Sequence, residues 1–178
     1  ILHRLVGSEM CIRDSTNMAA CGGLVAAMIL ASLLYGKVDL TLALNGALAG
    51  LVSITAGPDV ATPLQAILIG AIGGILCTLA IPLLDKLKID DVVGAISVHL
   101  VAGIWGTLVV GIPGLNGSGD FMTQLIGVVV IGVFVTVVSA IVWLVLKAVT
   151  GLRPSEEEEM TGLDVSELGM EAYPEFRN

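Results

Sequence analysis

The sequence has few charged residues. Asp, Glu, Lys and Arg make up 13% of its 178 residues, while hydrophobic residues make up 56%, and the mean hydropathy is +0.97. A soluble domain of this length would not carry so much apolar surface. The composition therefore excludes an ordinary soluble domain and predicts an integral membrane protein.

Residues that usually carry chemistry are also scarce. The three cysteines, Cys11, Cys21 and Cys77, lack the spacing of metal ligands, and the last two fall inside apolar runs where cysteine packs as a small hydrophobe. The sequence contains no nucleophile–base arrangement, no phosphate-binding loop and no metal-ligand motif. We therefore expect no enzymatic activity, no metal and no cofactor.

Positive charge is sparse as well. The formal net charge is −8, and the segment from Leu152 onward, with eight acidic and two basic residues, supplies −6 of it. The acidity is thus a property of the end of the chain rather than of the whole protein. We expect an acidic tail at residues 151–178 and no nucleic acid among the partners.

Long uncharged runs dominate what remains. Each of five runs exceeds the roughly 18 residues needed to cross a bilayer. They predict an all-α, polytopic membrane protein, with a transmembrane domain over residues 16–150. The five expected spans are about 16–36, 40–57, 62–84, 91–112 and 121–148.

The first fifteen residues do not match this pattern. They lack the long apolar core of a signal peptide and show no periodicity that continues into the first run. The string VGSEMCIRDS resembles a stray peptide seen at the ends of translated environmental reads. We interpret residues 1–15 as a non-native leader, and the pair Thr16-Asn17 as the cap of the first span.

Basic residues fall on one side of the predicted membrane topology. The loops after the second and fourth spans contain Asp59 and Asp120 but neither Lys nor Arg. The bases near the ends of the first, third and fifth spans are Lys37, Lys86, Lys88, Lys147 and Arg153. By the positive-inside rule, the first helix runs inward and the acidic tail is cytoplasmic.

One histidine stands inside an apolar run. Asp90 and Asp91 can accept hydrogen bonds from the free N–H groups of a helix start, which places His99 roughly 12 Å further along the axis, near mid-bilayer. Gly94 and Gly103 leave the helix bare near this ring. Either His99 bonds to a neighbouring helix, or it marks a transport path.

The second span contains a polar residue of its own. Asn45 lies one turn into the predicted helix, between apolar neighbours. It would either bond to an adjacent helix or contact a permeating molecule. The glycine pairs Gly46/Gly50 and Gly70/Gly74, each four residues apart, predict close packing of the second and third spans against other helices.

Four motifs, in collinear order, resemble the second half of the ammonium transporter family, which includes the Rhesus proteins. The resemblance covers about residues 16–173. The motifs are Thr16-Asn17 with the alanines after it, GALAGLVSITAG at 46–57, Ile89–Asp91 joined to VHLVAGIWGTL at 98–108, and GLRPSEEEEMTGLDVSE at 151–167.

The resemblance implies eleven helices in the whole protein, homotrimers, and two inverted halves enclosing one narrow hydrophobic pore per subunit. The five spans would be the seventh to the eleventh. His99 matches the second of two facing pore histidines, whose partner belongs to a helix absent from this chain. Ala95, one turn before His99, would help to line the pore, while Gly103 lies beside it and Trp105 is offset and expected to pack.

This family likeness implies transport of ammonium or ammonia across the cell (inner) membrane. A bare ammonium ion in a dry pore would cost tens of kcal/mol, so shedding the proton is favoured. An imidazole with an unperturbed pKa near 6.5 can accept that proton. Two other functions remain open: an ammonium sensor that signals through its tail, and a nonfunctional fragment.

The chain departs from the family pattern at several positions. Leu100 and Ala102 stand where the family usually has glycine, Gly94 stands where an acid is common, and Pro154 replaces an aliphatic residue. The tail is either a solvated charge run or, as the resemblance implies, a docking segment that meets a PII-type signalling protein. Its candidate regulatory residues are Gly151, Arg153, Glu156, Glu157, Gly162 and Asp164.

Overall fold

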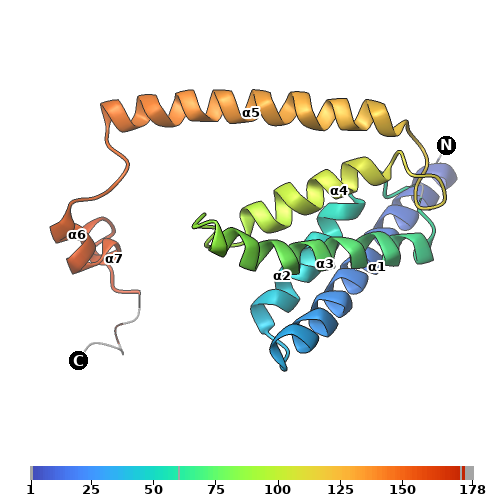
Figure 1. Cartoon of the computed structure of the whole chain (residues 1–178), viewed down its shortest axis with the longest axis horizontal. Coiled ribbons are helices and arrows are strands. Elements are labelled where there is room, and N and C mark those ends of the chain that lie inside the picture. Colours follow the sequence, from blue (N-terminus) through green and yellow to red (C-terminus); the bar gives the residue numbers. More distant parts are fainter. Residues whose placement is uncertain (1, 60, 173, 175–178) are drawn as a thin grey trace. The chain divides into compact units, whose positions relative to one another are not determined.

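The structure is a computed structural model that describes residues 2–59, 61–172 and 174, with side chains described from residue 9 onward. Within these residues it contains helices and no strand (Figure 1). The chain divides into two units, Ile1–Val130 and Ile131–Asn178. An all-helical fold is what the long apolar runs predict.

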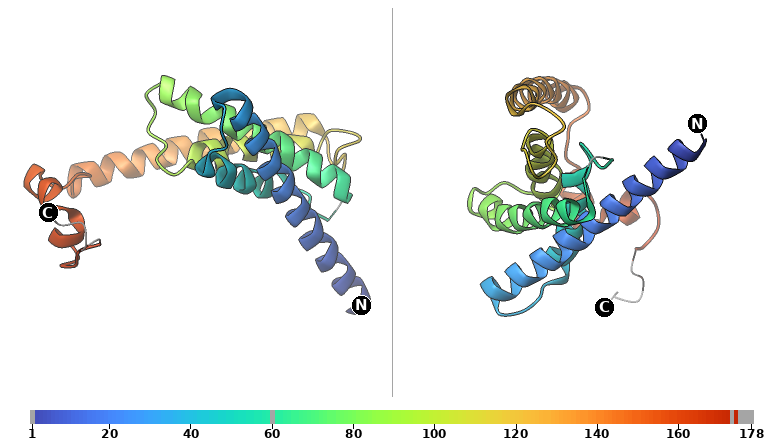
Figure 2. Two further views of the ribbon diagram at one scale, coloured as in Figure 1. Left: turned by 90° about the horizontal axis from the view of Figure 1, so that it is seen from below. Right: turned by 90° about the vertical axis from the view of Figure 1, so that its right-hand side faces the viewer.

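Helix α1 runs without interruption over Leu2–Tyr35, as both views of Figure 2 show in blue. Residue 16 is therefore not a helix boundary, and the prediction that Thr16 caps the first span is wrong. The Thr16 hydroxyl instead donates to the carbonyl oxygen of Ile12, 2.6 Å away in the preceding turn. Ser15 is buried and its hydroxyl donates to the carbonyl oxygens of Ile12 and Pro58. The non-native origin of residues 1–15 stays a prediction.

Helices α2 (Leu40–Ile54) and α3 (Pro63–Lys86) begin at recognisable caps. The Asp39 carboxylate accepts a hydrogen bond of 2.9 Å from the backbone N–H of Leu42. Thr62 and Gln65 form a capping box, and proline occupies the first helical position, where its missing N–H costs nothing. These caps satisfy donors that the helix itself leaves free.

Helices α1, α2 and α3 pack through small residues. A Cβ atom on Gly70 would overlap the backbone of Ala19, and one on Gly74 would overlap the backbone of Gly23. Gly23 in turn lies against Gly46 of α2. Since lipid provides no hydrophobic drive between helices, close backbone contact of this kind supplies the packing attraction. The packing predicted from the glycine spacing is confirmed.

The fourth apolar run forms a π-helix, η1 (Ala95–Val101), continued by α4 (Ala102–Val109). Val98, Ala102 and Val109 are buried. They pack this segment against the bundle, where Val98 and Ala102 join Ala49 and Cys77 in one core cluster. The expected span of 91–112 is thus shorter than predicted and starts with an unusual helix.

Among the described residues, three helical segments are long and apolar enough to cross a membrane: Glu9–Tyr35, Pro63–Lys86 and Phe121–Val149. Helix α2 has 15 residues and reaches about 22 Å, less than a hydrocarbon core of about 30 Å. Pro58 lies four residues after the end of α2. Gly94, with φ +74°, delays the start of η1 and so shortens the fourth helix. The number of helices that cross the membrane stays a prediction.

Helix α5 (Phe121–Val149) has 29 residues and none of them is buried. Its start is capped by Asp120, whose carboxylate accepts hydrogen bonds of 2.8 Å from the backbone N–H and the hydroxyl of Thr123. These bonds lower the pKa of Asp120 below its usual value. In the second unit, two short helices follow, α6 (Glu156–Thr161) and α7 (Leu163–Ser166).

Candidate functional site

His99 lies on η1, on the face that does not pack against the bundle. Its neighbours Ser97 and Val98 are buried, whereas His99, Ala95 and Leu100 are exposed, Leu100 by 54%. Among the residues that the structure describes, none forms a hydrogen bond to the His99 ring. Within the described residues the ring is thus neither buried nor bonded to another helix, and both interpretations of His99 stay predictions. The ring and Ala95 form an open face of this chain.

Asp91 lies just before η1 and bonds to its first turn. Its Oδ1 accepts from the backbone N–H of Ile96 at 3.0 Å, and its Oδ2 accepts from the N–H and hydroxyl of Ser97 at 3.0 and 2.9 Å. Asp90 is exposed and takes no part in these bonds. Only one member of the predicted capping pair therefore contacts the helix start.

Gly94 makes this contact possible. Its φ of +74° and ψ of +24° form a left-handed turn, a conformation that glycine adopts without penalty. The turn folds the chain so that the Asp91 carboxylate faces residues five and six positions later. A Cβ on Gly94 would lie 3.2 Å from the amide of Asn45, so the half-buried Asn45 borders this turn.

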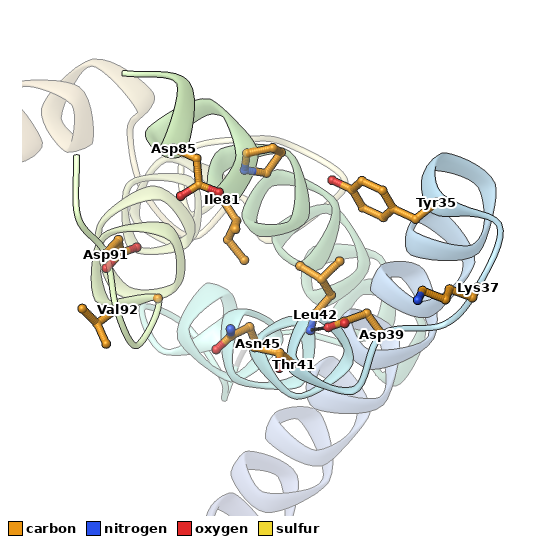
Figure 3. A pocket seen from close by; sticks show the side chains of 12 residues that line it. Tyr35, Lys37, Asp39, Thr41, Leu42, Asn45, Ile81, Asp85, Asp91 and Val92 are labelled. Carbon is orange, nitrogen blue, oxygen red and sulfur yellow. Dashed lines mark hydrogen bonds between the residues drawn. The ribbon is translucent and has the colours of Figure 1, made fainter. Parts of the chain in front are cut away.

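A pocket of about 430 Å³ opens beside the same turn, where the ends of α1, α2, α3 and η1 meet (Figure 3). Three carboxylates face this space together with Lys37: Asp39 before α2, Asp85 in the last turn of α3, and Asp91 before η1. His99 is not among the lining residues. The other lining residues are Tyr35, Thr41, Leu42, Asn45, Ile81, Pro82, Val92 and Gly94.

No sequence motif predicts this pocket directly. Each of the three acids lies at the end of an apolar run, where its position is typical of an ordinary cap or loop residue. Only folding brings these three acids to one pocket. No group of three or more His, Cys, Asp or Glu within the described part of the chain could hold a metal ion.

Trp105 and Gly103 lie further along, on α4. The indole Nε1–H of Trp105 donates to the carbonyl oxygen of Ile69 at 3.0 Å, and the ring packs on a buried cluster that includes Ile54 and Val109. A Cβ on Gly103 would meet Val52 at 3.7 Å, an ordinary contact. Trp105 therefore packs α4 against α3, and a place of either residue beside the pore stays a prediction.

The tail has local structure of its own. Arg153 pairs with Glu159 at 2.8 Å, with both side chains exposed to solvent. Gly151 and Gly162 adopt left-handed φ values of +77° and +99°. The Asp164 carboxylate accepts from the backbone N–H groups of Val165 and Ala172. Glu156 and Glu157 lie exposed in the first turn of α6. These bonds are local to the tail, and both interpretations of the tail stay predictions.

Ser155 and Glu158 form a capping box at the start of α6. The Glu158 carboxylate accepts from the backbone N–H of Ser155 at 2.8 Å and from its hydroxyl at 2.7 Å. These two bonds lower the pKa of Glu158. Because the folded pKa is depressed, the cap contributes stability above the ordinary pKa of glutamate, about 4.3, and loses it as pH falls through the folded value.

We expect this cap to be visible in an acid titration. The amide signal of Ser155, followed by NMR on the full chain in lipid nanodiscs, should shift as the pH falls below about 4. Glu158→Gln keeps an acceptor oxygen but cannot titrate, so it should abolish the shift. Glu157→Gln, in the same exposed turn, is the control and should leave it intact. A shift that persists in Glu158→Gln would contradict the assignment.

Comparison with known proteins identifies the family. A family model described as Ammonium Transporter Family matches residues 7–173. The chain belongs to the ammonium transporter family. The matched range begins within residues 1–15, the expected leader. Together with the apolar helices, this membership makes the chain an integral membrane protein.

Relatives of this ammonium transporter chain are considerably longer. Ammonium transporter Amt2 of Archaeoglobus fulgidus is 39% identical to it, over 93% of this chain and 39% of the relative. Ammonium transporter Amt1 of Haloferax mediterranei is 40% identical, over 90% of this chain and 32% of the relative. The chain thus spans about a third to two fifths of the length of these proteins.

Solved structures show the same likeness. The structure named Sensor Amt Protein superimposes with a TM-score of 0.81 at 36% identity, covering 88% of this chain and 41% of that one. Mep2 of Candida albicans gives a TM-score of 0.76 at 26% identity, covering 94% and 42%. The fold described above is therefore that of part of an Amt/Mep protein.

Proposed function

We propose that this chain forms part of a pore that carries ammonium or ammonia across the cell membrane, with His99 as the group that accepts and returns a proton. The observation that carries this proposal is the family match over residues 7–173. The open face of η1 supports it, because His99 and Ala95 are exposed there. Once further residues of the whole protein cover this face, the His99 ring would lie inside a pore.

The physical argument concerns the proton. An ammonium ion stripped of water in a low-dielectric pore loses tens of kcal/mol of solvation, whereas neutral ammonia loses far less. A histidine ring can take the proton on one nitrogen and keep a hydrogen bond on the other. Residues around His99 on the open face, such as Ala95 and Leu100, have no titratable group. His99 is thus the proton acceptor of this face.

Several further features belong to the same proposal. The relatives are more than twice as long as the matched region, so their additional residues provide the surface that would cover His99 and supply a facing histidine. We propose homotrimers, a cytoplasmic acidic tail, and docking of a PII-type signalling protein on that tail. The family match, which extends to residue 173, supports a docking role for the tail.

A second function, ammonium sensing, has one observation in its favour. The structure named Sensor Amt Protein is 36% identical and covers 88% of this chain. A sensor would use the same pore residues to bind ammonium and would pass the signal through the tail. Transport without a requirement for residues 151–178 would favour the transporter, whereas ammonium binding without flux would favour the sensor.

The test is a chimera. Residues 7–173 replace the matching stretch of Archaeoglobus fulgidus Amt2, and the chimera is expressed in cells that lack ammonium uptake. We expect it to restore growth on low ammonium, and we expect residues 16–178 expressed alone to fail. The unmodified Amt2 and a chimera with a scrambled insert are the controls. A chimera that reaches the membrane but carries no ammonium current would overturn the proposal.

A further inference from the structure

We infer that Asp91 is a positioning residue for His99: its carboxylate clamps the π-helical segment Ala95–Val101 and so fixes which way the histidine ring points. The effect of Asp91 on transport rests on the proposed function, whereas its effect on the orientation of the His99 ring does not. The clamp itself is a structural claim about this chain. Three observations carry it.

The first is the helix type. π-Helices are rare and usually occur as single turns inside α-helices, often at functional sites. Here seven residues, Ala95–Val101, adopt this form at the very start of a helix. An α-helix over the same residues would have fewer residues per turn. It would rotate Ala95 and His99 to different directions relative to α4, whose buried face is fixed by Ala102, Gly106 and Val109.

The second is the bonding of the first turn. The N–H groups at a helix start lack partners within the helix. The Asp91 carboxylate supplies acceptors for two of them, Ile96 and Ser97, and also takes the Ser97 hydroxyl, all at 2.9 to 3.0 Å. Hydrogen bonds to an ionised acceptor are stronger and more directional than neutral ones. Three such bonds from one side chain therefore hold the first turn in one orientation.

The third is the location of Ser97. This residue is fully buried, with 0% exposure, while His99, two positions later, is exposed. Fixing both the backbone and the side chain of Ser97 sets the rotation of the segment about its axis. Gly94, in its left-handed turn beside Asn45, brings the carboxylate within reach. The clamp thus links the pocket at the helix ends to the face that carries His99.

The experiment has one arm that does not depend on transport. In the full chain in nanodiscs, carbethoxylation of the His99 ring by diethyl pyrocarbonate is followed by mass spectrometry. We expect Asp91→Ala to change the rate by about threefold, a change within the range for loss of one net hydrogen bond, and Asp91→Asn, which keeps one acceptor oxygen, to change it less. Asp90→Ala is the matched control and should leave the rate unchanged. Circular dichroism verifies that each variant remains helical.

The second arm measures ammonium current in the chimera. We expect Asp91→Ala to lower the maximal current about tenfold with little change in the half-saturating concentration, because the ring is misplaced rather than absent. Asp91→Asn should recover part of it. An unchanged carbethoxylation rate in both Asp91 variants would overturn the clamp whatever the current. If the rate changes but the current does not, the clamp stands and the proposed role of His99 in transport fails.

Discussion

Replacing Gly70 with alanine is expected to destabilise the α1–α3 packing by about 3 kcal/mol, the upper end of the range for overpacked sites. The added Cβ would overlap the carbonyl oxygen, the carbonyl carbon and the Cα of Ala19. These are backbone atoms in the middle of a helix, so no side-chain rotation can make room. The two helices must separate, and the backbone contacts along their interface weaken with them.

Two other glycines serve as matched controls. Gly103→Ala adds a Cβ that meets Val52 at an ordinary 3.7 Å, and Gly132→Ala adds one with nothing within 4 Å. Alanine favours helix by up to about 1 kcal/mol over glycine, so both variants should be as stable as the original or slightly more so. The measurement is denaturation in mixed micelles, followed by the fluorescence of Trp105 and Trp143 and by circular dichroism. Equal stability of Gly70→Ala and Gly103→Ala would show that the interface adapts.

The close packing of this interface was predictable from the sequence, because the spacing of its glycines is a local pattern. Gly70 and Gly74 are four residues apart and therefore share a helix face, as do Gly46 and Gly50. In a chain this apolar, a face without side chains can only serve close packing. The start of α3 has an equally local signal, because Thr62 and Gln65 form a full capping box before a helix with Pro63 at its first position. Ser155 and Glu158, three residues apart, have the sequence pattern of a capping box as well.

Local patterns failed where two structures compete for the same residues. Thr16 and Asn17 have the composition of a cap, but in a continuous helix a threonine hydroxyl bonds back to the carbonyl four residues earlier. Asp91 and Gly94 lie in an apolar run that predicts an α-helix, yet a left-handed glycine and a carboxylate that captures two N–H groups delay and widen it. A hydropathy profile detects neither the threonine bond within the continuous helix nor the delayed start of η1.

The exposure of His99 could not be read from the sequence for a different reason. Helical periodicity shows which residues share a face, but the face that meets other helices depends on contacts distant in the chain. Val98 and Ala102 pack on Ala49 and Cys77, from α2 and α3, and this leaves His99 outside. The pocket between the helix ends has the same origin, since Asp39, Asp85 and Asp91 meet only after folding.

His99→Ala should reduce ammonium current in the chimera by about 100-fold, the lower limit for removal of a positioned acid–base group. Substitution takes away the one titratable ring on the open face of η1 and leaves Ala95, Leu100 and Ile104, which cannot accept a proton. Solid-supported-membrane electrophysiology with ammonium pulses measures the effect. Purified protein at equal density in the proteoliposomes excludes a defect in expression.

A second substitution separates proton transfer from hydrogen bonding. Glutamine at position 99 can donate and accept hydrogen bonds but does not titrate near neutral pH. If His99 carries a proton, His99→Gln should be as defective as His99→Ala. Leu100→Ala, a change at the adjacent exposed residue, is the control and should retain current, or gain it if the leucine narrows the pore.

These currents show whether His99 accepts a proton or only forms a hydrogen bond. Full current in His99→Gln would mean that the ring only holds a hydrogen bond, and proton acceptance would have to come from another group. Loss in both His99 variants with current retained in Leu100→Ala would require a titratable nitrogen at this position. The ring is exposed in this chain. Under the proposed function, its desolvation, and with it the preference of the pore for neutral ammonia over ammonium, would depend on the residues that cover the ring.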